Sequence, residues 1–175
     1  MIYTVGHSTH PLDAFVGLLR NAGVQALADV RRYPGSRRHP HFNRDALADA
    51  LPAAGIVYAH LGRLGGRRDA VPGSPNRGWE NEAFVAYADH MATPEFAAGV
   101  EELETISAER VTAVMCAEAP WWRCHRRLLA DALTVRGWTV RHIDPAGRIT
   151  DHALTDFAVV ERGTITYPPA QTELL

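Results

Sequence analysis

Short apolar runs alternate along the chain with longer segments whose apolar residues recur at helical spacing. The apolar runs predict strands at residues 2–5, 26–30, 56–60, 111–116 and 139–143. The helical spacing predicts helices at residues 11–22, 44–51, 82–91, 93–107 and 124–136. Strands that alternate with helices form a parallel sheet covered on both faces, so the pattern predicts an α/β fold. We expect a single three-layer domain with a mainly parallel sheet of about five strands flanked by helices.

The alternation weakens after Asp144. The pattern therefore predicts an α/β core domain at residues 1–144 and a C-terminal extension at residues 145–175. Within the extension, two short apolar stretches flank Arg162 and Gly163, a turn signal that favours a short β-hairpin packed on the core. The 175 residues are enough to bury one core, and no repeat or low-complexity linker divides them.

The composition, 46% hydrophobic and 22% charged, is that of an ordinary globular domain. No apolar run approaches the roughly 20 residues of a membrane-spanning helix. The first residues carry no basic segment followed by a signal-peptide core. We therefore expect a cytoplasmic protein without a membrane partner, in which Cys116 and Cys124 are free thiols or ligands rather than a structural disulfide. A redox pair of these two cysteines remains an open alternative.

Charge is unevenly distributed, although the formal net charge is only −2. All 18 basic residues are arginines. Nine of them lie at residues 31–77 beside three acidic residues, whereas residues 80–109 hold eight acidic residues and no arginine. This distribution predicts one basic and one acidic face. Because a guanidinium binds phosphate or carboxylate through two parallel hydrogen bonds, the basic half favours an anionic partner, either a small molecule or a nucleotide.

Polar residues or glycines follow each of the five predicted strands. In open α/β sheets, ligands bind beyond the carboxyl ends of the strands. The shared edge is therefore expected to form one pocket. The residues expected to converge there are His7, Asp29, Arg31, Glu118 and Cys124.

The segment VTAVMCAEAPWWRCHRR concentrates the candidate chemistry. Glu118 follows the predicted strand, and Cys124 opens the next predicted helix. The N–H groups and the dipole at a helix start stabilise anions and thiolates. With His125 and Arg126 beside it, the Cys124 thiol is expected to have a lowered pKa and nucleophilic character.

These positions suggest roles for individual residues. Cys124 is the candidate nucleophile, and Glu118 and His7 are candidate acid–base or orienting groups. The predicted anion- and substrate-binding residues are Ser8, Asp29, Arg31, Ser36, Arg37, Gly65, Gly66, His125 and Arg126. Among them, the expected anion clamps are Arg31, Arg37 and Arg126. Asp29 and Arg31 could instead pair with each other, because buried charges are normally paired.

Two other kinds of site fit the spacing less well. A phosphatase or sulfurtransferase loop places an arginine about five residues after its cysteine, whereas six residues separate Cys116 from Arg123 here. Common zinc patterns use pairs of closely spaced ligands, which this chain lacks. No cofactor is predicted. If a transition metal binds, the ligands would be Cys116, Cys124 and His125.

Four segments carry a resemblance to a known family. They read GHSTHPLDAF, DVRRYPGSRRHPHFN, GIVYAHLGRLGG and MCAEAPWWRCHRRLLADAL. Together they resemble the bacterial and archaeal domain of unknown function family 488 over roughly residues 3–143, and the CxE…CHR element is the most specific part. The resemblance implies a compact α/β domain and no particular activity. Trp121 and Trp122 are bulkier than the resemblance leads us to expect, and the tail after Asp144 lies outside it.

The sequence thus favours a thiol-dependent transferase or hydrolase, or an anion-binding protein, for a phosphorylated or nucleotide-like ligand at the carboxyl edge of the sheet. One alternative is a non-catalytic nucleic-acid-binding module in DNA repair or stress, because aromatic residues are interleaved with the arginines. Against it, no helix-turn-helix, zinc-finger or RRM signature is present, and the pI is near 6.5. A structural or interaction protein is a further alternative, and the sequence predicts no oligomeric state.

Overall fold

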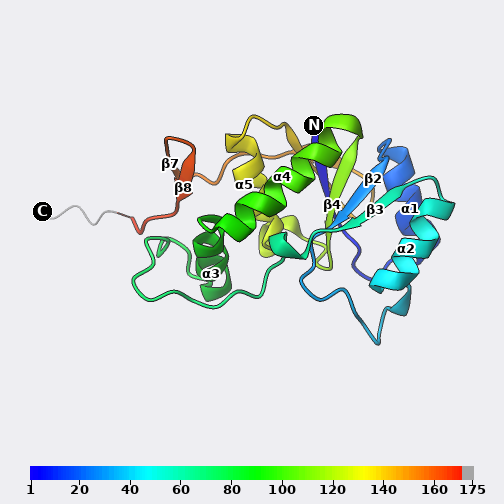
Figure 1. The fold of residues 1–175 in the computed structure, drawn as a ribbon, viewed down its shortest axis with the longest axis horizontal. Coiled ribbons are helices and arrows are strands. Elements are labelled where there is room, and N and C mark those ends of the chain that lie inside the picture. Colours follow the sequence, from blue (N-terminus) through cyan, green and yellow to red (C-terminus); the bar gives the residue numbers. More distant parts are fainter. Residues whose placement is uncertain (171–175) are drawn as a thin grey trace, which may run out of the picture.

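The computed structural model describes residues 1–170 of the 175-residue chain (Figure 1). The strands are β1 (Ile2–Gly6), β2 (Ala26–Asp29), β3 (Val57–His60), β4 (Thr112–Cys116), β5 (Val140–Ile143), β6 (Ile149–Asp151), β7 (Val159–Glu161) and β8 (Thr164–Thr166). The α-helices are α1 (Leu12–Asn21), α2 (Arg44–Ala53), α3 (Glu82–Met91), α4 (Pro94–Glu109) and α5 (Arg126–Val135). Short 3-10 helices are η1 (Pro40–Phe42), η2 (Gly62–Leu64) and η3 (Trp121–Arg123).

The main sheet has the strand order β3-β2-β4-β1-β5-β6. The first five strands run parallel, and β6 pairs antiparallel with β5 at the edge. The predicted α/β fold is therefore confirmed. The apolar pattern does not predict the sixth strand, because all three residues of β6 are exposed.

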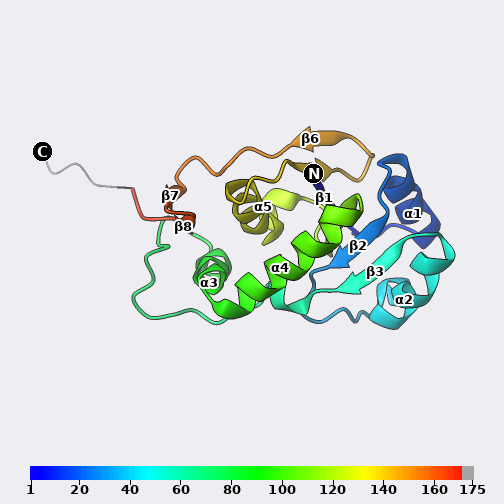
Figure 2. The same ribbon diagram turned by 45° about the horizontal axis from the view of Figure 1, so that its top comes forward.

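Apolar residues on the two faces of the sheet form two separate core clusters. Alternate residues of a strand point to opposite faces. Val5 and Met115 accordingly pack in one cluster with the apolar sides of α1 and α2. Ile2 and Val114 pack in the other cluster with α3, α4 and α5. The result is a sheet between two helical layers (Figures 1 and 2).

The register of the central strands brings their carboxyl ends together. β4 lies between β2 and β1, and Gly6 of β1 is level with Cys116 of β4. The backbone N–H of His7 donates to the carbonyl of Cys116, and that of Val30 donates to the carbonyl of Met115. The loops that follow β1, β2 and β4 therefore start side by side, at the edge where the sequence predicts a pocket.

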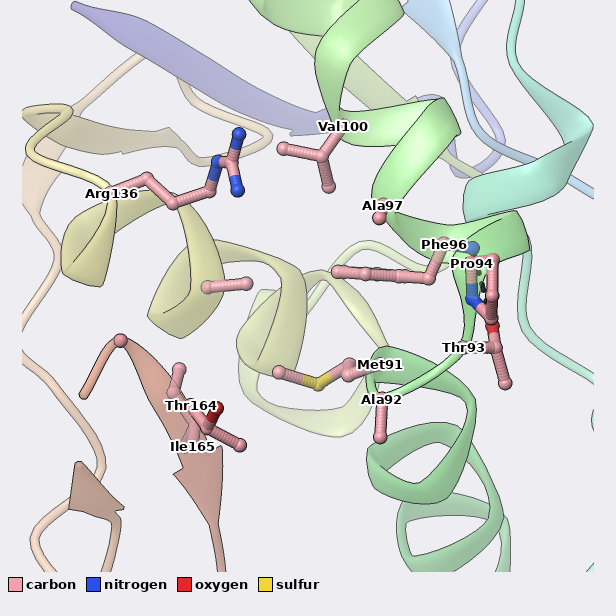
Figure 3. A pocket seen from close by; sticks show the side chains of 12 residues that line it. Met91, Ala92, Thr93, Pro94, Phe96, Ala97, Val100, Arg136, Thr164 and Ile165 are labelled. Atoms are coloured by element: carbon pink, nitrogen blue, oxygen red, sulfur yellow. Dashed lines mark hydrogen bonds between the residues drawn. The ribbon is translucent and has the colours of Figure 1, made fainter. Parts of the chain in front are cut away.

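The chain after β6 crosses to the layer that holds α3, α4 and α5. It ends in the hairpin β7–β8, and Ile165 and the fully buried Tyr167 pack against that layer. A cavity of about 420 Å³ lies between the hairpin and helices α4 and α5 (Figure 3). Within residues 1–170, no helix is long and apolar enough to cross a membrane.

Candidate functional site

Two glycines allow the loops at the sheet edge to approach one another closely. A Cβ at Gly6 would collide with the backbone carbonyl of Glu118. A Cβ at Gly66 would lie 3.0 Å from Nδ1 of His125. The loop after β1 therefore packs directly on the loop after β4, and the loop after η2 packs on the histidine that precedes α5.

Two buried thiols and one imidazole form the centre of the site. Cys116 and Cys124 are free cysteines. The Nδ1 atom of His125 lies 3.6 Å from Sγ of Cys124 and 3.9 Å from Sγ of Cys116. These three atoms all lie within 4.8 Å of one another. The group offers a soft ligand set for a metal ion or, without a metal, a thiol beside an activating partner.

The two thiols differ in acidity because each strongly affects the pKa of the other. The neighbouring Cys116 thiol lowers the pKa of Cys124 well below its usual value, with help from the charges of His125 and Arg126. The neighbouring Cys124 thiol, together with burial, raises the pKa of Cys116. Of the two, Cys124 is therefore the thiol whose ionised form is favoured.

The start of a helix contributes little to the lowered pKa of Cys124. The predicted helix at residues 124–136 begins only at Arg126, because the residues before Cys124 form the separate 3-10 helix η3. Cys124 has extended backbone angles, φ −126° and ψ 153°. Its carbonyl accepts from the N–H of Arg127 in the first turn of α5. The groups that the structure places beside the Cys124 sulfur are the Cys116 thiol and the Nδ1 atom of His125.

The imidazole of His125 is fixed by packing. Its ring lies 5.0 Å from the ring of Tyr87, whose hydroxyl donates to the carbonyl of Leu64. Its Nε2 atom is buried and has no hydrogen-bond partner among residues 1–170. Nδ1 is therefore the atom that His125 presents to the thiols.

Two adjoining cavities open at this edge of the sheet. The first, about 320 Å³, is called the thiol pocket here, because Cys116, Cys124 and His125 line it. The second, about 550 Å³, is called the His7 cavity and is also lined by Ser8 and Ser36. Their linings share Arg31, Tyr33, Arg67, Ala117 and Glu118.

The walls of both cavities carry positive charge. Arg32, Arg67 and Arg123 line the thiol pocket, and Arg38 and Arg67 line the His7 cavity. Within the described chain, none of these four arginines forms an ion pair. Glu118 is the one acidic residue of either lining, and it is exposed. Guanidinium groups without a carboxylate partner favour the binding of an anion.

Two lining residues hold strained backbone conformations. Ser8 has φ 48° and Arg67 has φ 60°, in the left-handed region that non-glycine residues rarely adopt. Both residues line the His7 cavity. Backbone strain of this kind persists where the surrounding structure enforces it, and it clusters at functional sites.

Asp29 and Arg31 form an internal pair, which is the alternative that the sequence left open. The Nε and Nη2 atoms of Arg31 donate to the two carboxylate oxygens of Asp29 at 2.8 and 2.7 Å. Asp29 also accepts from the Tyr58 hydroxyl, and Arg31 donates to the carbonyl of Phe42. Arg31 borders both cavities, but most of its donors are already engaged.

His7 orients Arg31. Its Nδ1 lies 2.9 Å from the carbonyl of Ser8, so this nitrogen carries the proton, and its Nε2 lies 3.2 Å from Nη1 of Arg31. Burial, together with the charge of Arg31, lowers the pKa of His7 to about 4 despite the bond to Ser8. The ring is therefore neutral at neutral pH. It also stacks on Phe42 with ring centroids 4.3 Å apart.

Three residues that the sequence predicts to bind the anion do not line either cavity. Arg37 is exposed and belongs to neither cavity lining. Arg126 is only 1% exposed, and its guanidinium donates to the carbonyls of Glu118 and Ala119, so it supports the loop instead of clamping an anion. Gly65 is buried against the backbone of Arg32.

Of the arginines that line the cavities, sequence reasoning selected only Arg31 for the site. Arg32, Arg38 and Arg67 lie in irregular segments and Arg123 ends η3, and there the periodicity of the sequence gives no direction for a side chain. The available signal was the density of arginine in residues 31–77, which marks the region but not the individual residues.

A second buried polar cluster, the Asp131 network, lies between α5 and the C-terminal segment. His142 joins Thr4 at 2.7 Å and His152 at 2.9 Å. Asp131 accepts from the Nε2 atom of His152 and from the hydroxyl of Tyr167, each at 2.8 Å. Burial and the nearby His152 lower the pKa of His142 to about 3. Burial and Asp131 raise the pKa of Tyr167. Sequence reasoning did not predict this network.

Comparison with known families matches residues 11–133 to the Domain of unknown function DUF488. The matched range covers most of the chain and includes the segment from Cys116 to Arg126. No curated protein and no solved structure matches the chain.

Proposed function

The chain belongs to the DUF488 family, and we propose that it is a thiol-dependent transferase or hydrolase acting on a phosphorylated or nucleotide-like substrate, with Cys124 as its nucleophile. One observation carries the proposal. The Cys124 thiol lines the same pocket as Arg67 and Arg123, which have no ion-pair partner among the described residues. A nucleophile and cationic groups on one cavity wall suit a substrate whose reacting centre is an anion.

The geometry supports a covalent mechanism. The Cys124 thiolate, favoured by the neighbouring Cys116 and His125, attacks phosphorus, and the S–P bond forms as the P–O bond to the leaving group breaks. The departing oxygen keeps the electron pair and takes a proton from the carboxyl group of Glu118, at the mouth of the pocket. Water or an acceptor hydroxyl then attacks phosphorus and gives its proton to Glu118. The S–P bond breaks, and its electron pair returns to Cys124.

The arginines and His7 have supporting roles in this scheme. Arg67 and Arg123 stabilise the charge on the non-bridging oxygens. His7 holds Arg31 in place, since its neutral ring presents Nε2 to Nη1 of Arg31. We further propose that the protein works in the cytoplasm, where glutathione and thioredoxin keep such thiols reduced.

Alkylation of the thiols tests the proposal. Wild-type protein at pH 7 is treated with iodoacetamide, and the modified residues are identified by mass spectrometry in the presence and absence of inorganic phosphate. We expect Cys124 to react first, Cys116 to stay unmodified, and phosphate to slow the reaction of Cys124. Cys124→Ser is the control and should take up no label. Equal labelling of both cysteines, or labelling of Cys124 that phosphate does not affect, contradicts the proposal.

Single-stranded DNA in the same experiment tests the alternative ligand. A nucleic-acid-binding module would bind the strand with strong salt dependence and with the same affinity in Cys124→Ser. For the proposed enzyme, we expect a phosphate monoester to protect Cys124 at least as well as a DNA strand of equal phosphate concentration.

A second candidate function is metal binding at the two thiols and His125. The observation that favours it is the close grouping of the three ligand atoms, within 4.8 Å of one another. Thiolate and imidazole ligands suit Zn²⁺, and a three-residue set leaves a fourth position for water or substrate. Elemental analysis of protein dialysed against Zn²⁺ separates the candidates. One equivalent of zinc, lost in Cys116→Ser, favours the metal site, whereas no retained zinc favours the free thiolate.

A further inference from the structure

A fourth cavity adjoins the His7 cavity. It has a volume of about 430 Å³, and its lining includes Trp121, Trp122, His142 and Pro145. We call it the tryptophan cavity. Its lining shares Ala119 and Pro120 with the His7 cavity, so the aromatic cavity adjoins the basic one.

The aromatic side chains of this cavity are held in fixed orientations. The ring of Trp121 stacks on His142 with centroids 3.9 Å apart and planes 5° apart. Trp122 stands nearly perpendicular to Trp121, at 89°, with centroids 5.8 Å apart. His142 is itself held at both nitrogens, by Thr4 and by His152. Trp121 therefore packs on a histidine whose two ring nitrogens are both hydrogen-bonded.

Trp122 does not contribute to the core. It is 53% exposed, and neither core cluster contains it. A large ring left open beside a cavity, next to a second fixed ring, is available for stacking with a planar ligand. The rim adds polar groups, namely Thr150, Asp144 and the strongly exposed Arg148, which pairs with Asp144.

We infer that the tryptophan cavity binds the base of a nucleotide whose phosphate occupies the neighbouring basic cavities. The inference rests on the proposed function, since it takes the phosphate position from that proposal and adds the class of substrate. The cavity beside Trp122 and the basic His7 cavity meet at residues 119–120, which line both. A nucleotide carries both an aromatic base and a phosphate, whereas a sugar phosphate has no base and would occupy only the basic cavities.

Isothermal titration of the protein with AMP and with ribose 5-phosphate tests the inference. Stacking of one base on an aromatic side chain increases affinity about tenfold or more, so AMP is expected to bind at least about tenfold tighter than ribose 5-phosphate. Trp122→Ala should abolish this advantage and leave the affinity for ribose 5-phosphate unchanged. Val160→Ala is the control, because Val160 is also a half-exposed apolar residue and lines none of these cavities.

The outcomes separate this inference from the proposed function. Equal affinity for the two ligands, or an equal loss of both in Trp122→Ala, overturns the base site and leaves the thiol mechanism standing. Preferential AMP binding that depends on Trp122 but does not protect Cys124 from iodoacetamide supports the base site and contradicts the thiol mechanism. Failure of both ligands to bind overturns both.

Discussion

The thiol pocket and the Asp131 network are both buried polar clusters, but they differ in how their hydrogen bonds are completed. In the Asp131 network, each carboxylate oxygen accepts from a donor of the chain, and both nitrogens of His142 are bonded. In the thiol pocket, Nε2 of His125 has no partner within residues 1–170, and four nearby arginines have no carboxylate.

This difference in hydrogen bonding indicates that the two clusters have different roles. A buried polar group without a partner costs stability, so a cluster that only holds the fold is expected to satisfy its own atoms. The Asp131 network meets that condition and joins α5 to the C-terminal segment. The thiol pocket leaves donors open beside a cavity, as a site that awaits a ligand does. Substitutions at four residues can break or sharpen this contrast.

The largest effect is expected from Asp131→Ala. This substitution leaves His152 and the hydroxyl of Tyr167 buried without an acceptor, so the free energy of unfolding should fall by about 3–5 kcal/mol. Urea denaturation measures the loss. Tyr167→Phe, which removes one hydrogen bond, should cost only about 1 kcal/mol.

The contrast between the two clusters also predicts that Asp131→Ala leaves the reactivity of Cys124 unchanged. The folded variant should alkylate Cys124 at the wild-type rate, measured below the urea transition. A loss of stability under about 1 kcal/mol, or a parallel fall in thiol reactivity, would show that the two clusters are not separate in purpose.

An intermediate effect is expected from Arg67→Ala and from Arg123→Ala. Each removes a charged donor from the pocket wall, so the concentration of phosphate that half-protects Cys124 from iodoacetamide should rise about tenfold. Arg37→Ala provides a control of equal charge change, because Arg37 lies outside both cavity linings. If all three variants weaken protection alike, the effect comes from net charge and not from the pocket.

The smallest effect is expected from Cys116→Ala, as a shift in a pH profile. Loss of the Cys116 thiol removes the largest cause of the lowered pKa of Cys124, so the midpoint of the alkylation rate against pH should move upward. Cys124→Ser, in which Cys116 is the one remaining thiol, should react only at alkaline pH. An unchanged midpoint in Cys116→Ala would mean that the charges of His125 and Arg126 alone set the acidity.

The lowered pKa of Cys124 also makes the stability of the folded state depend on pH. The thiolate form of Cys124 is favoured in the folded state, so its contribution is complete above the pKa of an unfolded thiol, about 8.5. The contribution is lost as the pH falls through the lower folded value. His7 acts in the same direction, because burial lowers its pKa from 6.5 to about 4. Stability should therefore decrease as the pH falls from 6.5 toward 4.

Periodicity in the sequence was sufficient for the sheet and for the edge that carries the site. The apolar runs that contain Val5 and Met115 set strand positions, and parallel pairing then placed His7 and Cys116 at one edge. Strand order and side-chain direction in loops depend on long-range packing, which the local pattern does not encode. For that reason the sequence pattern selected Arg37 as an anion-binding residue, whereas the structure has Arg38 in the lining of the His7 cavity.

Local sequence patterns also did not predict contacts between residues that lie far apart in the chain. His152 meets Asp131 across 21 positions, and Tyr167 meets it across 36. A hydrogen bond of that kind leaves no periodic trace. The start of α5 was misplaced by two residues because Pro120 and the two tryptophans fold into a separate turn.

The central position of β1 has a practical consequence for work with shortened versions of the protein. The family match begins at residue 11 and ends at residue 133, yet β1 pairs with both β4 and β5 in the middle of the sheet. A recombinant fragment cut at the match boundaries would lack two of the five parallel strands and would expose the apolar interior. Expression trials should therefore keep the first six residues and everything through Tyr167.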